Sequence, residues 1–328
     1  MSIEELICEI KNNYQVRFDY DEKKNFRDYI KTKLESMYYI KLSESGNDSK
    51  IKNLYTDIEG CDVILTAHYD TPRSIPKDLM IISKYIKITN RYIVIASFIP
   101  IIIFIIIKPL ISATLAAIIL MRLLISNKNK NNYNDNTSGI ISLLYLIDKF
   151  KKSKIESENN NKEYSEKIGF IFFDYEERSF KGSKKFNEHY ESVLKDKIFI
   201  NLDCVGGIDN TIMISPRDKN YKNNNDYKDI IYLLKYQLEK ADEFKDKNVH
   251  IKPKHSKSDY LKIKSKVSLG ISNEEMYKCG YYIPNIHTYK DTKDNIDVNF
   301  IKKFTDKLHI ALYKYLDIKY SKSINLDK

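Results

Sequence analysis

The sequence predicts an α/β protein: a three-layer α/β/α sandwich around a mostly parallel, mixed sheet, with an inserted hydrophobic helical hairpin. Short apolar runs at 62–67, 168–173 and 198–202 have the length of strands and no polar face, which is typical of parallel strands covered on both sides. Segments with helical periodicity lie between them, and this alternation indicates a layered α/β domain. The hairpin is predicted because the run 92–125 is far more apolar than the rest of the chain.

The elements are expected in the following order. Residues 2–39 predict two amphipathic helices, and a strand at 52–56 precedes the apolar strand 62–67 as its expected partner. A helix at 137–150 and a polar loop at 151–166 follow. The remaining expected elements are helices at 181–194, 227–244 and 299–315, and strands at 168–173, 198–202, 211–215 and 267–271.

This order divides the chain into N-terminal helices packed on a main domain, a hairpin that interrupts that domain, and a short tail. The expected bounds are 1–39 for the helices, 40–78 and 128–320 for the two parts of the main domain, 79–127 for the hairpin and 321–328 for the tail.

The composition excludes several classes of protein. Apolar residues make up 42% and charged residues 30% of the 328 residues, which is typical of a folded chain and not of a disordered or polytopic membrane protein. The formal net charge is +10, but the lysines are spread along the chain without a recognition motif, so no nucleic-acid partner is expected. Four widely spaced cysteines predict reduced thiols, and the acidic start of the chain predicts no cleaved signal peptide.

The apolar run 92–125 predicts two helical legs, 92–107 and 110–125, joined at Lys108-Pro109. Each leg reaches about 24 Å at about 1.5 Å per residue. The hydrocarbon core of a bilayer is about 30 Å thick, so the hairpin either dips into the membrane or spans it with help from its flanks. A hairpin buried in the protein core is the alternative, but the run of isoleucines shows no polar face.

Basic residues on both sides of this run predict its orientation. They are Lys77, Lys84, Lys87 and Arg91 before it and Lys128 and Lys130 after it, whereas only Lys108 lies at the tip. Because positive charge stays cytoplasmic, both ends of the hairpin are expected on that side, at the cell membrane and in contact with its lipid.

Residues suited to metal chemistry follow the predicted strands. His68 and Asp70 stand at the end of the strand 62–67, where residues two apart share a face, so Asp70 can orient the imidazole of His68. Adjacent carboxylates are rarely buried at a strand end without a cation. The other candidate motifs are Asn134–Gly139, Asp174–Glu177 with Gly182-Ser183, Asp203 with Gly206-Gly207, and His287–Asp297. Each alone also fits a helix cap or a turn.

Taken in order, these motifs resemble the co-catalytic zinc aminopeptidases of clan MH, the family of bacterial leucyl aminopeptidase, aminopeptidase Y and glutamate carboxypeptidase. They read HxD, DNxSG, EE followed by GS, NLDxxG and HTxxDTxDNID, and they extend over roughly residues 50–320. The resemblance implies the zinc-peptidase fold and a hydrolase that removes N-terminal residues from peptides.

The resemblance also implies two zinc ions, for which Co²⁺ or Mn²⁺ could substitute. Asp135 would bridge them, with His68 and Asp203 completing one site and Glu177 and His287 the other. Glu176 would be the general base that takes the proton from the attacking water, and Asp70 would support His68. Ser258-Asp259 resembles the family's SD motif, with a turn-forming pair as the alternative.

Some features depart from the family or leave alternatives open. Ser179 and Phe180 stand where the family commonly has Gly-Leu, which concerns the substrate pocket rather than the metals. A carboxypeptidase would need arginines for the substrate carboxylate, and Arg73, Arg178 and Arg217 are scattered candidates. A glutaminyl cyclase of this family normally has a tryptophan-lined pocket, and the chain has no Trp. A catalytically inactive membrane scaffold is a further alternative, and the oligomeric state is not predicted.

Overall fold

The computed structural model describes residues 2–46, 50–77, 109–157, 164–208, 211–239, 248–277 and 280–324. The first leg of the predicted hairpin, Lys84, Lys87, Arg91, Lys108 and Cys279 lie outside these residues. The helices are α1 (Ile3–Asn13), α2 (Tyr20–Tyr38), α5 (Pro109–Leu124), α6 (Gly139–Ser157), α7 (Lys181–Leu194), α8 (Asn225–Glu239) and α9 (Val298–Ile324). The strands are β1 (Ser43–Glu44), β2 (Leu54–Tyr55), β3 (Val63–His68), β4 (Ile168–Phe173), β5 (Ile198–Leu202), β6 (Thr211–Pro216), β7 (Val249–Ile251), β8 (Val267–Tyr277) and β9 (Gly280–Tyr282).

The described strands form one mixed sheet in the order β1-β2-β4-β3-β5-β8-β6-β7, with β9 paired to β8. Its four central strands, β4, β3, β5 and β8, are parallel, and every residue of β3, β4 and β5 is buried. The pairs β1–β2, β2–β4, β6–β8 and β8–β9 are antiparallel, whereas β6 and β7 are parallel. The prediction of a mixed α/β sheet is therefore confirmed, but among the described strands its parallel pairs do not outnumber the antiparallel ones.

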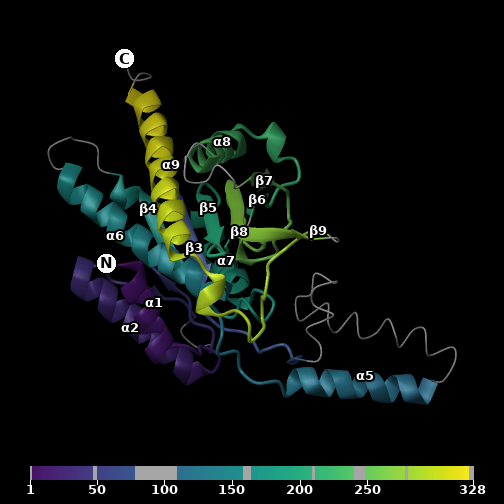
Figure 1. Ribbon diagram of the computed structural model, residues 1–328. Helices are drawn as coiled ribbons and strands as arrows, with labels where there is room; N and C mark the ends of the chain where they lie inside the picture. The colour runs from purple at the N-terminus through teal and green to yellow at the C-terminus, as the bar shows by residue number, and fades with distance from the viewer. Residues whose placement is uncertain are drawn as a thin grey trace.

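Helices cover both faces of this sheet, which makes three layers (Figure 1). One apolar cluster joins the sheet to α1, α2, α6, α8 and α9 and includes Phe26, Leu144 and Phe304. A smaller cluster joins the other face to α7 and to the short helical turn Asp259–Leu261, through Phe186 and Tyr260.

Two sequence predictions for the fold are wrong in detail. The strand near 52–56 exists as β2, but it pairs with β4 rather than with β3, because β4 lies between them in the sheet. The predicted loop 151–166 begins as helix, since α6 continues to Ser157. A pair one helical turn apart, Lys152 Nζ to Asp148 Oδ2 at 2.8 Å, supports this extension.

The inserted segment is described only from Pro109 onward. There, α5 is a helix, and it projects from the body of the protein (Figure 1). Among the described residues, no helix is both long enough and apolar enough to cross a bilayer.

A buried ion pair fixes α2 to the main domain. Lys23 Nζ lies 2.7 Å from Asp174 Oδ1, and the two side chains are 1% and 0% exposed. The Lys23 ammonium also lies 3.3 Å from the centre of the Tyr175 ring. Asp174 directly follows β4, so this contact ties the N-terminal helices to the carboxyl edge of the sheet.

Replacing Lys23 by Met should strongly destabilise the protein, because it leaves the Asp174 carboxylate buried without its cation. Breaking such a pair costs about 3–5 kcal/mol in the free energy of unfolding. Denaturant unfolding would measure the loss. Lys24→Met is the matched control, since Lys24 pairs with Asp28 on the exposed side of the same helix. Equal stability of the two variants would contradict the role given to the buried pair.

Candidate metal centre

The register of the parallel strands brings the candidate residues to one edge of the sheet. His68, the last residue of β3, lies opposite Phe173, the last residue of β4. Thr66 of β3 lies opposite Asn201 of β5, so Asp203, two residues further along, is level with His68. Ligands of such sheets bind at the carboxyl ends of strands, and this is where the candidate residues meet.

Asp135 reaches the same place from the segment Tyr133–Ser138 that precedes α6. The amides of Asn134 and Asp135 donate to the carboxylate of Asp291 at 2.9 and 3.0 Å. The Asn136 side chain accepts from the amides of Gly139 and Cys204 and donates to the carbonyl of Leu202, so it both caps α6 and links α6 to the end of β5. The Asp135 backbone is therefore fixed on both sides.

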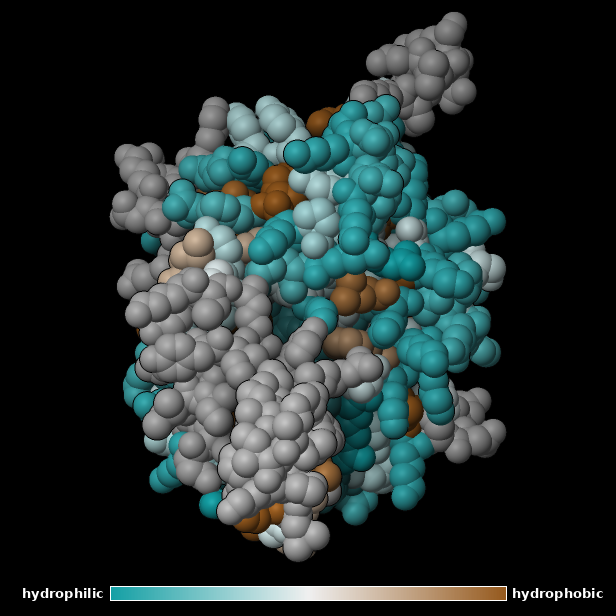
Figure 2. All heavy atoms as spheres, turned by 90° about the vertical axis from the view of Figure 1, so that its right-hand side faces the viewer, coloured by the Kyte–Doolittle hydropathy of each residue, from teal (hydrophilic) through white to brown (hydrophobic). Residues whose placement is uncertain are grey.

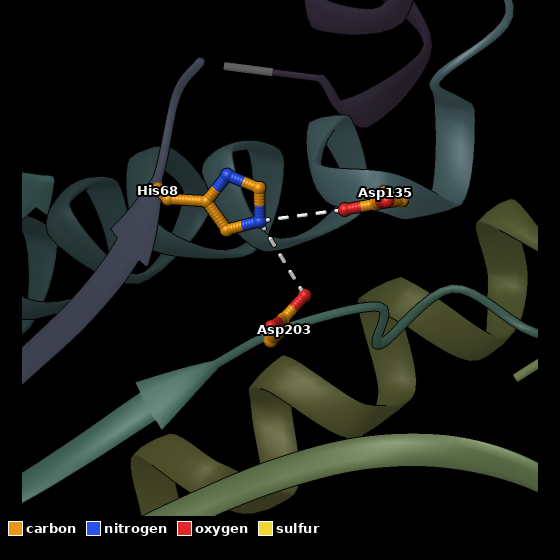
Figure 3. Close-up of side chains that lie close together, drawn as sticks. All are labelled: His68, Asp135 and Asp203. Carbon is orange, nitrogen blue, oxygen red and sulfur yellow. Dashed lines mark ion pairs between the residues drawn. The ribbon is translucent and has the colours of Figure 1, made fainter. Parts of the chain in front are cut away.

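Three groups of side chains in the described residues could hold a metal ion, and two of them share Asp135. The third joins His68, Glu176 and Glu177 and so places Glu176 beside the other two groups. In the first group, His68 Nε2 lies 3.4 Å from Asp135 Oδ1 and 3.6 Å from Asp203 Oδ1 (Figure 3). In the second group, His287 Nε2 lies 2.9 Å from Asp135 Oδ2 and 3.1 Å from Glu177 Oε2. Ligand atoms within each group lie within 4.8 Å of one another, a spacing at which both groups could hold a metal ion.

The chemistry of these donors fits a cation better than it fits a hydrogen-bond network. Glu177 Oε1 and His287 Nδ1 are buried and form no hydrogen bond with the described residues. Buried polar atoms without partners are rare, and they call for a ligand or an ion. Mixed carboxylate and imidazole donors suit Zn²⁺.

Asp70 connects the loops that follow β3 and β4. Its Oδ1 accepts from the amide of Glu176 at 3.0 Å and its Oδ2 from the amide of Glu177 at 3.3 Å. His68 Nδ1 lies 3.5 Å from Asp70 Oδ1 and only 3.2 Å from the Asp70 carbonyl oxygen. Asp70 thus lies beside His68, and it also binds the backbone amides of the two glutamates, contacts that the sequence does not predict.

Burial and crowding of like charges shift the pKa values of the acidic groups here. Burial raises the pKa of Glu176 well above its usual range, although the charge of His68 opposes the shift, and the carboxylates of Glu177, Asp203 and Asp259 add to it. Burial raises the pKa of Glu177 to about 7, although His287 opposes the shift. Burial opposes ionisation of Asp135, but the imidazoles of His287 and His68 outweigh it and lower the pKa of Asp135. Because these buried carboxylates oppose one another's ionisation, the site favours the presence of positive charge beside them.

Two further acidic residues belong to this site. Burial raises the pKa of Asp291 to about 8 and that of Asp259 to about 7. Asp259 is among the carboxylates that act on Glu176, so the SD motif lies at the site rather than in a remote turn. Asp291 is part of the HTxxD motif, but nothing in the sequence predicts that its carboxylate binds the backbone amides of Asn134 and Asp135.

The four other histidines lie outside both ligand groups. His189 is exposed, and His309 packs against Phe150 with ring centres 4.5 Å apart. The Tyr281 hydroxyl lies 3.1 Å from His250, and His255 Nε2 lies 2.7 Å from Glu274 Oε2.

The fold resembles that of several solved enzymes. A Zn-dependent exopeptidase from Parabacteroides distasonis matches with a TM-score of 0.60 at 16% identity, over 95% of this chain and 97% of that one. The LapA aminopeptidase of Legionella pneumophila matches with a TM-score of 0.57 at 16% identity, over 95% and 68%. A glutaminyl cyclase from Bacteroides thetaiotaomicron matches with a TM-score of 0.57 at 16% identity, over 95% and 97%. No significant match to a curated protein was found.

The decisive comparison is with a family model. The model of peptidase family M28 matches residues 125–311, more than half of the chain. This protein belongs to peptidase family M28. The predicted enzyme class, a peptidase, is confirmed at this level. The matched part of the M28 peptidase includes Asp135, Glu176, Glu177, Asp203 and His287, whose individual roles stay predictions.

If the two groups bind metal, Zn²⁺ should stabilise this M28 peptidase against heating. A ligand at about 100 times its Kd stabilises a folded protein by about 2.7 kcal/mol, and a chelator should reverse the gain. His68→Ala should reduce the Zn²⁺-dependent rise in Tm, since His68 belongs to the first group. His189→Ala is the control, because His189 is exposed and in neither group. An unchanged rise in the His68 variant would contradict the assignment.

Proposed function

We propose that this protein is a membrane-anchored metallo-aminopeptidase that removes N-terminal residues from peptides, using two zinc ions and Glu176 as general base. The observation that carries the proposal is the pair of ligand groups sharing Asp135, at the carboxyl edge of the sheet of an M28 peptidase. The solved enzymes of this fold include a Zn-dependent exopeptidase and an aminopeptidase, which supports the choice.

Each ligand group would hold one zinc ion. Asp135 would bridge the ions through its two oxygens, with His68 and Asp203 on one side and Glu177 and His287 on the other. Once bound, the two ions supply an activated water and a polarised scissile carbonyl. Co²⁺ or Mn²⁺ would be acceptable substitutes, since the donors are oxygen and imidazole nitrogen.

Glu176 is the best-placed general base. It is buried, its backbone amide is held by Asp70, and it follows the β4 edge immediately before the proposed ligand Glu177. In the proposed reaction, its carboxylate takes the proton from the attacking water and passes it to the leaving amine. Positive charge bound beside it would oppose the rise in its pKa and keep it ionised.

A carboxypeptidase is the second candidate, and one observation favours it. The guanidinium groups of Arg73 and Arg178 lie 4.8 and 4.9 Å from the centre of the same ring, that of Phe18. Arg178 directly follows Glu177, so two arginines that are distant in the sequence come together near the site. Arginine side chains are well suited to binding a carboxylate.

The membrane anchor would be formed by the inserted segment. On α5, the apolar side chains of Ile118 and Met121 are 49% and 64% exposed. The two ends of the insert meet beside the main domain, where Arg73 forms a β-bridge with Lys128 and the Ser74 amide donates to the Asn127 carbonyl at 2.8 Å. A segment that leaves and returns at one point fits a re-entrant or doubly spanning anchor, with the catalytic domain on the cytoplasmic face.

The activity is tested with Glu176→Gln, which keeps the shape of the side chain but cannot accept a proton. Wild type and variant, both purified in detergent with zinc, are given peptides with free or acetylated N-termini, and products are read by mass spectrometry. We expect wild type to shorten only free N-termini, and the variant to be slower by about 10²- to 10⁴-fold.

Other products would replace the proposal. Loss of C-terminal residues would favour the carboxypeptidase. Cyclisation of an N-terminal Gln without peptide cleavage would favour glutaminyl cyclase activity. If wild type leaves all these peptides intact while binding two metal ions, the catalytically inactive scaffold would be favoured.

The anchor is tested with Ile118→Glu, which places a charge on α5. Binding to anionic vesicles, measured by co-sedimentation, should fall because a buried carboxylate is costly in the bilayer. Ile318→Glu on α9 is the matched control, since Ile318 is similarly exposed (44%) but lies on the main domain. Equal vesicle binding by both variants and wild type would refute the anchor.

A further inference from the structure

Arg17 is an arginine that the mechanism above does not use, and it is completely buried. It lies in the link between α1 and α2, with 0% of its surface exposed. A buried guanidinium is costly unless its N–H groups are well bonded. No carboxylate of the described residues forms an ion pair with Arg17, and burial lowers its pKa to about 10 although the charges of Asp70 and Asp135 oppose the shift.

Most partners of Arg17 lie on the two loops that carry His68 and Asp135. In addition, its Nη1 donates to the carbonyl of Tyr14, at the end of α1, at 3.0 Å. Its Nε donates to the carbonyl of Tyr69 at 2.5 Å, and its Nη2 donates to the Thr137 hydroxyl at 3.1 Å. Its backbone exchanges two hydrogen bonds with Thr71, at 3.0 and 3.1 Å. Tyr69 is the residue after His68, and Thr137 is two residues after Asp135.

We propose that Arg17 is a positioning residue for the metal centre, holding the His68 loop and the Asp135 loop at the spacing that the first ligand group needs. The inference rests on the proposed two-metal function. It concerns mainly one group, His68, Asp135 and Asp203, in which His68 Nε2 lies 3.4 Å from Asp135 Oδ1. A small slip of either loop would separate these atoms.

The second group is held by different contacts. Asp291 binds the backbone of Asp135, and Asp70 binds the amide of Glu177. Loss of Arg17 should therefore weaken one metal site more than the other. Lysine cannot replace Arg17, because a single ammonium group cannot donate to acceptors as far apart as the Tyr69 carbonyl and the Thr137 hydroxyl, whereas the planar guanidinium carries several N–H donors.

The test is metal binding by Arg17→Lys, measured by calorimetric titration of the metal-free full-length protein with Zn²⁺. Wild type should show two sites. The variant should keep one and bind the other about 10- to 100-fold more weakly, as is usual when a group supporting a metal ligand is lost. Arg27→Lys is the matched control: Arg27 is 1% exposed and bonds to the Tyr69 hydroxyl and Glu44 instead of the ligand loops' backbone. It should keep both sites.

A milder pair of variants keeps the inference testable if Arg17→Lys does not fold. Thr137→Val removes the acceptor of Arg17 Nη2, together with the bond that the hydroxyl donates to Asn132 Oδ1, and should weaken the same site. Thr137→Ser keeps the hydroxyl and should restore that site. Two unchanged sites in the variants, or equal losses in Arg17→Lys and Arg27→Lys, would overturn the inference, as would a wild type with one site. Because the measurement needs no substrate, failure to cleave peptides would refute the proposed function and leave this inference standing.

Discussion

The burial of many carboxylates at one edge of the sheet is the constraint on which the site depends. They come from loops distant in the sequence: Asp70, Asp135, Asp174, Glu176, Asp259 and Asp291 are buried, and Glu177 and Asp203 are half-buried. Like charges this close oppose ionisation, so the folded chain must supply positive charge or bind it. The N-terminal segment supplies part of it through Arg17, Lys23 and Arg27, each almost fully buried. The N-terminal helices are therefore part of the electrostatics of the site as well as a cover for the sheet.

The central strands and most of the candidate site could be predicted from the sequence, because burial of the strands determines where the apolar runs lie and where polar residues follow them. A strand buried on both faces must be wholly apolar, and its chain can become polar only where it leaves the sheet. The apolar runs that end at His68, Asp174 and Asp203 therefore mark both the strands and the edge where side chains converge. Parallel pairing in register then brings these ends together.

What could not be predicted depends on contacts between distant segments. Nothing around Arg17 or Lys23 marks them as buried, because arginine and lysine side chains are normally exposed. The partner of β2 depended on strand order, which periodicity does not determine. The second function of Asp70, binding two backbone amides of the β4 loop, required the relative placement of β3 and β4.

The position of the insert restricts how the chain can meet a membrane. The insert lies between two residues of one ligand group, since His68 precedes it and Asp135 follows it, and they are 3.4 Å apart. An odd number of crossings would place them on opposite sides of the bilayer and separate the group. The β-bridge between Arg73 and Lys128 closes the base of the insert within a few residues of His68 and Asp135. Any anchor built from this segment must therefore return to the face from which it leaves, which keeps the metal centre beside that face.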